Sequence, residues 1–187
     1  PDCVATFGFM EVQEKKPVFG NNQVEVTEKA AGRMGELYQI LRDRMIKTRQ
    51  LDQPEAALLA QRFVLQCVLA MFAEDRGLLP DSLFVACVKD CLESSASSYD
   101  VLGGLFNAMN TPGLTPAGRY KGVDYFNGGL FQQIDPIDLT HQELKFLEVA
   151  ALEDWSRVRP AIFGNIFESA IDEKERHAHG IHYTSEA

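Results

Sequence analysis

Hydrophobic residues recur at three- and four-residue spacing through most of this chain, which is the period of an amphipathic helix. The first stripe starts just after Thr27, a residue type that commonly caps helix N-termini. It contains Met34, Leu37, Tyr38, Leu41 and Met45. We therefore predict a first helix from residue 27.

The next helix has the clearest signals at both ends. Asp52 and Glu55 form a start that resembles a capping box, and Pro54 lies in the first turn, where proline is tolerated. Gly77 ends the segment, with Pro80 beyond it. Because apolar residues occupy most of its faces, we expect this helix to be the central, buried one.

The same periodicity predicts further helices, whereas two segments lack it. The remaining apolar stripes span residues 84–92, 99–109, 142–152 and 158–171. In residues 1–26 a weak alternation and a Gly-Asn-Asn sequence predict one or two short strands and a turn. Residues 110–136 contain Thr-Pro and Gly-Gly pairs, and a loop of that length in a compact domain is usually functional or part of an interface. The predicted fold is mainly α: a helical bundle with one long structured loop and a short N-terminal strand/turn segment.

The composition fits a single domain from a reducing compartment. Of 187 residues, 45% are apolar, which is enough to bury one sizeable core. No apolar run approaches the roughly 20 residues that cross a bilayer, and nothing resembles a signal peptide. The four cysteines form no CxxC pair, so we expect buried thiols rather than disulfides or a zinc site. We expect a cytoplasmic protein without membrane contact.

Charge is unevenly distributed along the chain. The net charge of −9 argues against a free-standing nucleic-acid binder. Residues 1–50 hold eight Lys and Arg against seven Asp and Glu, whereas residues 51–187 hold ten against twenty. The densest basic patch consists of Arg42, Arg44, Lys47 and Arg49. These cations either favour a helix C-terminus through its dipole or contact DNA phosphates, and the sequence leaves both interpretations open.

The second half of the long loop mixes aromatic residues, two cations and a Gly pair. Arg119 and Lys121 stand beside tyrosines, a combination that suits a sugar-phosphate surface. Phe126, Leu130 and Phe131 more commonly pin such a loop onto a bundle, because burial is the usual fate of large apolar residues. Arg119 and Lys121 therefore join the DNA-backbone candidates.

Two groups of residues resemble metal sites. Asp2 and Glu14 fit the PD…ExK pattern of nucleases, in which two carboxylates hold Mg²⁺. Such a site needs a rigid shell of surrounding elements, which this segment lacks. His177, His179 and His182 fall within six residues, without the i, i+4 spacing of ligands on a helix. We expect no metal site and no catalytic residue in this chain.

Other catalytic signatures are missing from the sequence. There is no Gly-rich phosphate loop, nucleophile elbow or S-adenosylmethionine fingerprint. There is also no Asn/Asp-Pro-Pro-aromatic tetrapeptide of the kind that amino-methyltransferases use around a flipped base. Glu74 and Asp75 close the central helix beside Arg76, and we expect a structural ion pair with a neighbouring arginine there. Alone, this chain should catalyse nothing.

Both ends of the sequence suggest a piece of a longer protein. The chain opens on Pro1, without an initiator Met. At the other end Ser185 is a good N-cap and Glu186 suits a first helical turn, yet the sequence stops at Ala187. We therefore expect an excised segment.

Five motifs follow one another in order along residues 27–187. They are Arg62-Phe63 through Met71-Phe72-Ala73-Glu74-Asp75-Arg76-Gly77, Tyr125-Phe126-Asn127-Gly128-Gly129-Leu130-Phe131, Asp154-Trp155-Ser156, Pro160-Ala161-Ile162-Phe163-Gly164 and Gly180-Ile181-His182-Tyr183-Thr184-Ser185. Together they resemble the helical spacer of MmeI-like DNA methyltransferases, which are large fused restriction–modification enzymes. Several ordered motifs are far more specific than any single one.

In that family the spacer links an N-terminal nuclease domain to a methyltransferase domain. The resemblance implies that residues 1–26 are the tail of a preceding nuclease-like domain or a linker. It implies a helical spacer over residues 27–176 and the start of a truncated methyltransferase domain at residues 177–187. DNA and the flanking domains are the implied partners.

The family transfers a methyl group from S-adenosylmethionine to N6 of adenine. Carried onto this sequence, Tyr183 and Thr184 are candidate cofactor contacts, with the Thr184 hydroxyl able to bind a carboxylate. The alternative is that Thr184 and Ser185 only cap the next helix. The resemblance implies S-adenosylmethionine in the parent protein, and Mg²⁺ if the parent has a nuclease domain. The chain alone should not bind the cofactor, because the following sheet is needed to close a pocket.

The predicted function is that of a connector. The spacer would hold the nuclease and methyltransferase domains of a site-specific DNA adenine methyltransferase at a defined separation, and its basic patch and loop would touch the DNA backbone. One alternative is a protein-interaction module that docks through residues 119–131. The other is a small metal-dependent nuclease that uses Asp2, Glu14 and the histidine cluster.

Overall fold

The computed structural model describes residues 19–158, apart from residue 127, and all regular elements in this range are helices. They are α1 (Phe19–Arg49), α2 (Gln53–Asp75), α3 (Leu83–Ser94), α4 (Ser98–Asn110), α5 (Gly128–Phe131), α6 (His141–Ala151) and the 3₁₀ turn η1 (Trp155–Arg157). The prediction of a mainly α bundle is confirmed. The predicted helix over residues 158–171 lies almost wholly outside the described residues.

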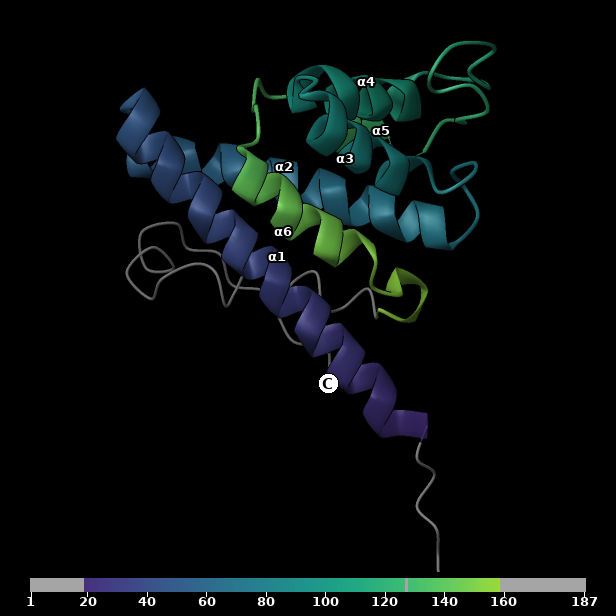
Figure 1. Cartoon of the computed structure of the whole chain (residues 1–187), viewed down its shortest axis with the longest axis horizontal. Coiled ribbons are helices and arrows are strands. Elements are labelled where there is room, and N and C mark those ends of the chain that lie inside the picture. Colours follow the sequence, from purple (N-terminus) through teal and green to yellow (C-terminus); the bar gives the residue numbers. More distant parts are fainter. Residues whose placement is uncertain (1–18, 127, 159–187) are drawn as a thin grey trace, which may run out of the picture.

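The helices form a bundle with α2 at its centre (Figure 1). Helix α1 crosses the front diagonally and packs on α2 and α6, while α6 lies between α1 and α3. Helices α4 and α5 form the upper part, where α4 packs on α3 and α5. The loop after α4 extends from this upper part.

Helix α1 begins at Phe19, so the strand and turn expected up to residue 26 are wrong for residues 19–26. Thr27 lies inside the helix and is not its N-cap. Propagating an existing helix adds one hydrogen bond for each residue fixed, so a turn-prone sequence beside a strong helical stripe can be drawn into it. Residues 1–18 lie outside the described residues.

Helix α2 has the predicted start and the predicted central place. The Asp52 carboxylate accepts a hydrogen bond from the Glu55 backbone N–H at 2.9 Å, and Gly77 follows the helix with a positive φ of 75°. By length and composition α2 could cross a membrane, but 56% of its most apolar stretch is buried inside the bundle. That is the packing of a core helix.

The core is continuous and contains the large aromatic side chains. Phe106 packs edge-on against Phe63 with ring centroids 6.3 Å apart, and against Phe131 at 5.5 Å. The fully buried large residues also include Trp155, Tyr38, Phe84, Met34 and Leu37. This network joins α1, α2, α4, α5 and η1 into one body.

Three cysteines lie in this core as free, buried thiols, as predicted from the sequence. Cys67, Cys87 and Cys91 are buried. Burial raises the pKa of the Cys87 thiol to about 12 and that of Cys91 to about 11, and it also raises the pKa of Cys67. Cys3 lies outside the described residues.

The long loop is ordered and contains one helical turn that the sequence pattern did not predict. The Thr115 N–H donates to the Val123 carbonyl at 2.8 Å, and the Gly122 N–H donates to the Thr115 carbonyl at 2.9 Å. Val123 is fully buried beneath this closed section. Helix α5 follows and carries Phe131 into the core.

Candidate nucleic-acid interface

Some cations of the basic patch near the end of α1 form contacts within the bundle. The Arg44 Nε donates to Glu143 Oε1 at 2.7 Å, and its Nη2 donates to the Asp138 carbonyl at 2.9 Å. Glu143 is buried and also completes the capping box of α6 with Thr140. Arg44 therefore joins α1 to the start of α6.

The other members of the patch differ in their surroundings. Arg49 donates to the Pro136 carbonyl at 2.5 Å, and Arg42 pairs with Asp43 and lies 5.7 Å from the centre of the Tyr38 ring. Lys47 is exposed and forms no ion pair with any described residue. Of the four candidates, Lys47 leaves the most charge for an external anion.

Of the two candidates in the loop, Arg119 forms an ion pair within the described residues and Lys121 does not. Arg119 forms an ion pair with Asp90 of α3, and the guanidinium holds the pKa of the Asp90 carboxyl below its usual value. Lys121 is exposed, with no ion pair among the residues that the structure covers. Arg119 thus fastens the loop to α3 and Lys121 remains available.

Most cations of the described range are used internally. Residues 19–158 contain thirteen Lys and Arg against nineteen Asp and Glu, a balance of −6. Eight of the thirteen pair with a carboxylate: Lys29, Arg33, Arg42, Arg44, Arg62, Arg119, Lys145 and Arg157. Within that range, Lys47, Lys89 and Lys121 have neither an ion pair nor a hydrogen-bond partner through their side chains. The surface therefore lacks the basic surplus of a strong DNA-binding module.

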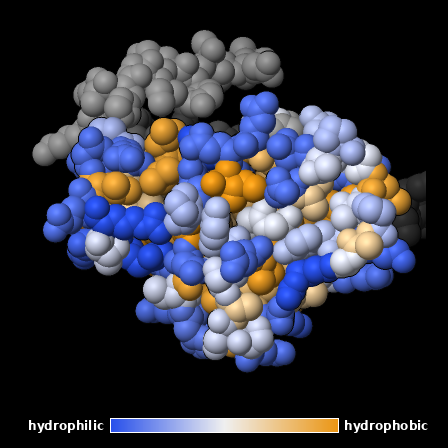
Figure 2. Space-filling view, turned by 90° about the horizontal axis from the view of Figure 1, so that it is seen from above, coloured by the Kyte–Doolittle hydropathy of each residue, from blue (hydrophilic) through white to orange (hydrophobic). Residues whose placement is uncertain are grey.

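Figure 2 shows how apolar and hydrophilic residues are distributed on the face seen from above. Apolar patches on this face are separated by hydrophilic residues and do not merge into one apolar surface. The exposed apolar side chains of the long loop include Leu114 and Tyr125, which are 64% and 50% exposed. Scattered apolar residues of this kind are normal on a protein surface.

The segment of residues 132–140, here called the α5–α6 segment, is held by buried polar contacts that the sequence did not reveal. Arg62 Nη1 donates to both carboxylate oxygens of Asp135, at 2.8 and 2.7 Å. The buried Gln66 amide donates to the carbonyls of Leu130 and Gln133, at 3.0 and 2.8 Å. A polar residue inside the apolar run of α2 was the one available signal for this role.

Asp138 fastens the same segment to the start of α4. Its carboxylate accepts from the hydroxyls of Ser97 and Ser98 and from the Tyr99 N–H, at 3.0, 3.1 and 3.2 Å. Burial acts to raise the pKa of Asp138, but these hydrogen bonds outweigh it and hold the pKa below its usual value.

Glu74 and Asp75 do not form the expected ion pair with an arginine among the described residues. Glu74 instead accepts from the Phe84 N–H at 2.5 Å, and Asp75 accepts from the Trp155 N–H at 2.6 Å. Burial raises the pKa of both carboxyls. Sequence reasoning missed this because both partners are backbone amides of elements that only the fold brings near. Arg76 stacks over the Phe72 ring, 5.2 Å from its centre.

Phe126 and Phe131 of the loop pack against the core of the bundle, as predicted for these two residues. Phe131 is fully buried and the Phe126 N–H donates to the Met109 carbonyl at 2.7 Å. The Tyr120 hydroxyl donates to the Val101 carbonyl at 2.6 Å, which ties the loop to α4.

The remaining candidates lie outside the described residues. These are the cofactor candidates Tyr183 and Thr184, the PD…ExK residues Asp2 and Glu14, and the histidine cluster at residues 177–182. Among the residues that are described, no group of three or more His, Cys, Asp and Glu side chains could hold a metal ion.

Comparison with known proteins shows which family this bundle resembles. The family described as "MmeI, helicase spacer domain" matches residues 58–131, which run from α2 through α5. A solved structure of the type IIL restriction-modification enzyme MmeI in complex with DNA matches with a TM-score of 0.61 and 29% identity. The chain contains an MmeI-like spacer region.

The MmeI likeness covers 84% of this chain but 21% of the MmeI chain. DNA methyltransferase A of Bacillus subtilis (strain 168) is 29% identical over 170 residues, which are 84% of this chain and 18% of that protein. The chain thus spans about a fifth of the length of these two relatives. The MmeI-like spacer corresponds to one part of such proteins.

Proposed function

We propose that this chain is the helical connector of an S-adenosylmethionine-dependent DNA methyltransferase of the restriction–modification type, one that methylates N6 of adenine. The observation that carries the proposal is the spacer match, which falls on the central helix α2 and on α3, α4 and α5. The connector would hold a preceding nuclease-like domain and a following methyltransferase domain at a defined separation. Residues 1–26 and 177–187 would be the junctions with those domains.

The bundle has the mechanical properties that a connector needs. Helix α1 contains 31 residues and is therefore about 45 Å long. It is fastened to the bundle between Arg33 and Arg44, because Arg44 contacts Glu143 of α6 and Arg33 contacts Glu153 beyond α6. Arg62 and Gln66 hold the irregular segment between α5 and α6. A body tied together in this way can transmit an orientation from one end to the other.

DNA contact by the connector would be limited to a few phosphates. Lys47 and Lys121 are the candidates whose charge is available, whereas Arg42, Arg44, Arg49 and Arg119 would contact phosphate only as additions to their internal bonds. Backbone contacts of this kind position a protein without reading bases.

The contact can be tested in the parent protein with Lys47→Glu and Lys121→Glu together. We expect a weaker affinity for non-specific duplex DNA and a salt dependence that is shallower by about one unit for each phosphate that the variant no longer binds. Lys145→Glu on α6 is the control, because Lys145 already pairs with Glu148. An unchanged slope in the double variant would remove DNA contact from the function of the connector.

The parent protein would bind S-adenosylmethionine in its following domain, with Tyr183 and Thr184 at the methionine end of the cofactor. Mg²⁺ would be needed only for a nuclease step, if the parent has that domain, and we propose a cytoplasmic location. Thr184→Ala should weaken cofactor binding by the parent, whereas Ser185→Ala should change helix stability alone. Equal effects of the two variants on cofactor affinity would support the capping role of Thr184 instead.

A second candidate function is a protein-interaction module that docks through residues 119–131. The observation in its favour is the exposure of Tyr125 in that segment and of Leu114 just before it. Leu114→Ser with Tyr125→Ser should then abolish binding of a protein partner. Full methylation by the same variant of the parent would favour the connector.

A further inference from the structure

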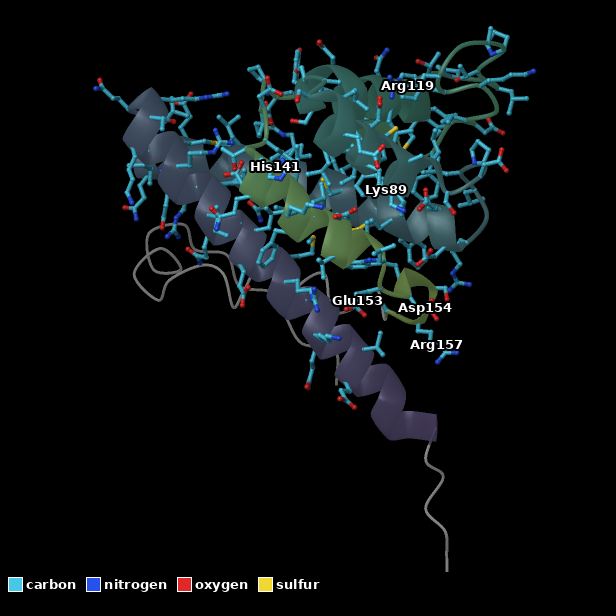
Figure 3. All side chains as sticks on the ribbon, in the orientation of Figure 1. Lys89, Arg119, His141, Glu153, Asp154 and Arg157 are labelled. Atoms are coloured by element: carbon cyan, nitrogen blue, oxygen red, sulfur yellow. The ribbon has the colours of Figure 1, made fainter. Side chains whose placement is uncertain are left out.

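Residues 152–158, here called the exit strap, follow α6 and are fastened to three helices. Trp155 is fully buried, and its indole Nε1 donates to the Ala150 carbonyl of α6 at 2.8 Å. Its backbone N–H donates to Asp75, the last residue of α2, at 2.6 Å. Two cations of α1 reach Glu153, with Lys29 Nζ at 3.3 Å and Arg33 Nη2 at 3.4 Å. Figure 3 shows Glu153 on the side of α1, with Asp154 and Arg157 on the turn beyond it.

The local contacts of the strap fix its shape. Asp154 accepts from the Ser156 N–H at 3.2 Å and pairs with Arg157 at 2.9 Å, and Val158 is buried. The strap is thus a preformed turn with a buried aromatic anchor. It is the last part of the chain that the structure describes, and the ion pairs with Glu153 join it to the N-terminal half of α1.

We propose that the exit strap is a positioning joint, in which Asp75 and Glu153 set the direction of the chain beyond Val158 relative to α1. This inference rests on the proposed connector function, because it names the residues that couple α1 and α2 to the segment after α6. The joint has two parts. Asp75 holds the turn at the end of α2, and Glu153 holds α1 against the turn.

The neighbouring carboxylates of α2 allow a matched test of the first part. Glu74 and Asp75 are adjacent and both accept from a backbone amide, but Glu74 holds Phe84 of α3 and Asp75 holds Trp155. Trp155 is the only tryptophan in the sequence, so its fluorescence reports on the strap alone. The test compares Asp75→Ala, Asp75→Asn and Glu74→Ala in the 187-residue chain.

We expect Asp75→Ala to shift the Trp155 emission to longer wavelength and to increase its quenching by acrylamide. The helices should still melt cooperatively, with a midpoint lower by about 2–12 °C, because one hydrogen bond is removed. Asp75→Asn should retain the native emission, since its amide oxygen can still accept, and Glu74→Ala should leave Trp155 protected. Unchanged quenching in Asp75→Ala, or equal quenching in Glu74→Ala, would overturn the role of Asp75.

The second part of the joint has its own matched control. The Lys29–Glu153 and Lys145–Glu148 pairs have the same side-chain exposures, 57% for the lysine and 21% for the glutamate, but Lys145–Glu148 lies within α6. We expect Glu153→Lys to speed hydrogen exchange of the α1 amides around Lys29 and Arg33, whereas Glu148→Lys should not. Combining Glu153→Lys with Lys29→Glu and Arg33→Glu should restore the protection. Equal exchange in the two single variants would overturn the coupling to α1.

In the parent protein the joint predicts a defect in turnover without a defect in cofactor binding. Asp75→Ala should lower the kcat of methyl transfer, leave the affinity for S-adenosylmethionine unchanged, and be rescued by Asn at the same position. An unchanged kcat would overturn the positioning role. A parent without methyltransferase activity would contradict the connector function, and the fluorescence of Trp155 would still decide whether the joint exists.

Discussion

Tyr120 attaches the long loop to α4, and this contact depends on Gly104. The Tyr120 hydroxyl reaches the Val101 carbonyl across the surface of α4, and Gly104 makes room for its ring. A Cβ at Gly104 would lie 2.5 Å from the Tyr120 hydroxyl oxygen, which is closer than atoms can approach. Helical glycine is normally unfavourable, so the absence of a side chain here serves the contact with the loop.

Gly104→Ala should therefore destabilise the protein although alanine is the better helix former. We expect a loss of about 1–3 kcal/mol from the displaced tyrosine, partly offset by about 1 kcal/mol of helix propensity. Gly32→Ala in α1, where nothing lies within 4 Å of the added Cβ, should instead stabilise by up to about 1 kcal/mol. Urea denaturation of both variants measures the difference, and equal effects would contradict the fitted contact.

Asp138 gives the stability a defined pH dependence. Its folded pKa is below the unfolded value, so its carboxylate stabilises the fold above the unfolded pKa and this contribution is lost as pH falls through the folded pKa. Asp138→Asn should lose stability at pH 7 and lose less on acidification than the original chain. Free energies of unfolding at pH 7 and pH 3 give the comparison. A variant as acid-sensitive as the original would place the titration elsewhere.

At the scale of elements, the helices with strong periodicity were predicted, and those governed by distant partners were not. Helix α2 was predicted with its start and end because caps and apolar positions are local in sequence. The first two turns of α1 were missed because residues 19–26 carry turn signals, although the helix extends through them. Helix α5 was missed because it is a single turn held by its packing on α4.

The buried Gln66 side chain is one of the anchors of the α5–α6 segment. Gln66→Leu should leave the carbonyls of Leu130 and Gln133 without their donor, at a cost of about 2–4 kcal/mol. Gln61→Leu on the same helix, where no hydrogen bond of the side chain is found within the described range, should change stability by less than about 0.5 kcal/mol. Thermal and urea unfolding would show the contrast. Similar small changes in both variants would mean that water can replace the Gln66 amide.

The candidate site was less accessible to sequence reasoning than the fold. The basic patch was found as a cluster in the sequence, but the roles of its members depend on partners far along the chain. Arg44 meets Glu143 across 99 residues and Asp75 meets Trp155 across 80. No local spacing encodes such pairs. Only the folded bundle shows which cations form internal ion pairs and which, like Lys47, could bind an external anion.

At the scale of the whole molecule, charge and packing favour a role in joining domains over a role in binding DNA. The described residues carry a surplus of acid, most cations form internal pairs, and the buried polar contacts lie between elements. A module that binds DNA strongly has the opposite balance. The charge and packing of the described residues therefore suit the proposed connector role better than that of a DNA-binding module.

Salt-titrated binding to non-specific duplex DNA tests this central claim most directly. The 187-residue chain would be compared with the same chain extended through the following domain, each with and without S-adenosylmethionine. We expect little or no binding by the chain at physiological salt, and tight binding by the extended protein that depends on the cofactor. Equal, salt-steep binding by both would make the bundle itself the DNA-binding module. Binding by neither would contradict the assignment to a DNA methyltransferase.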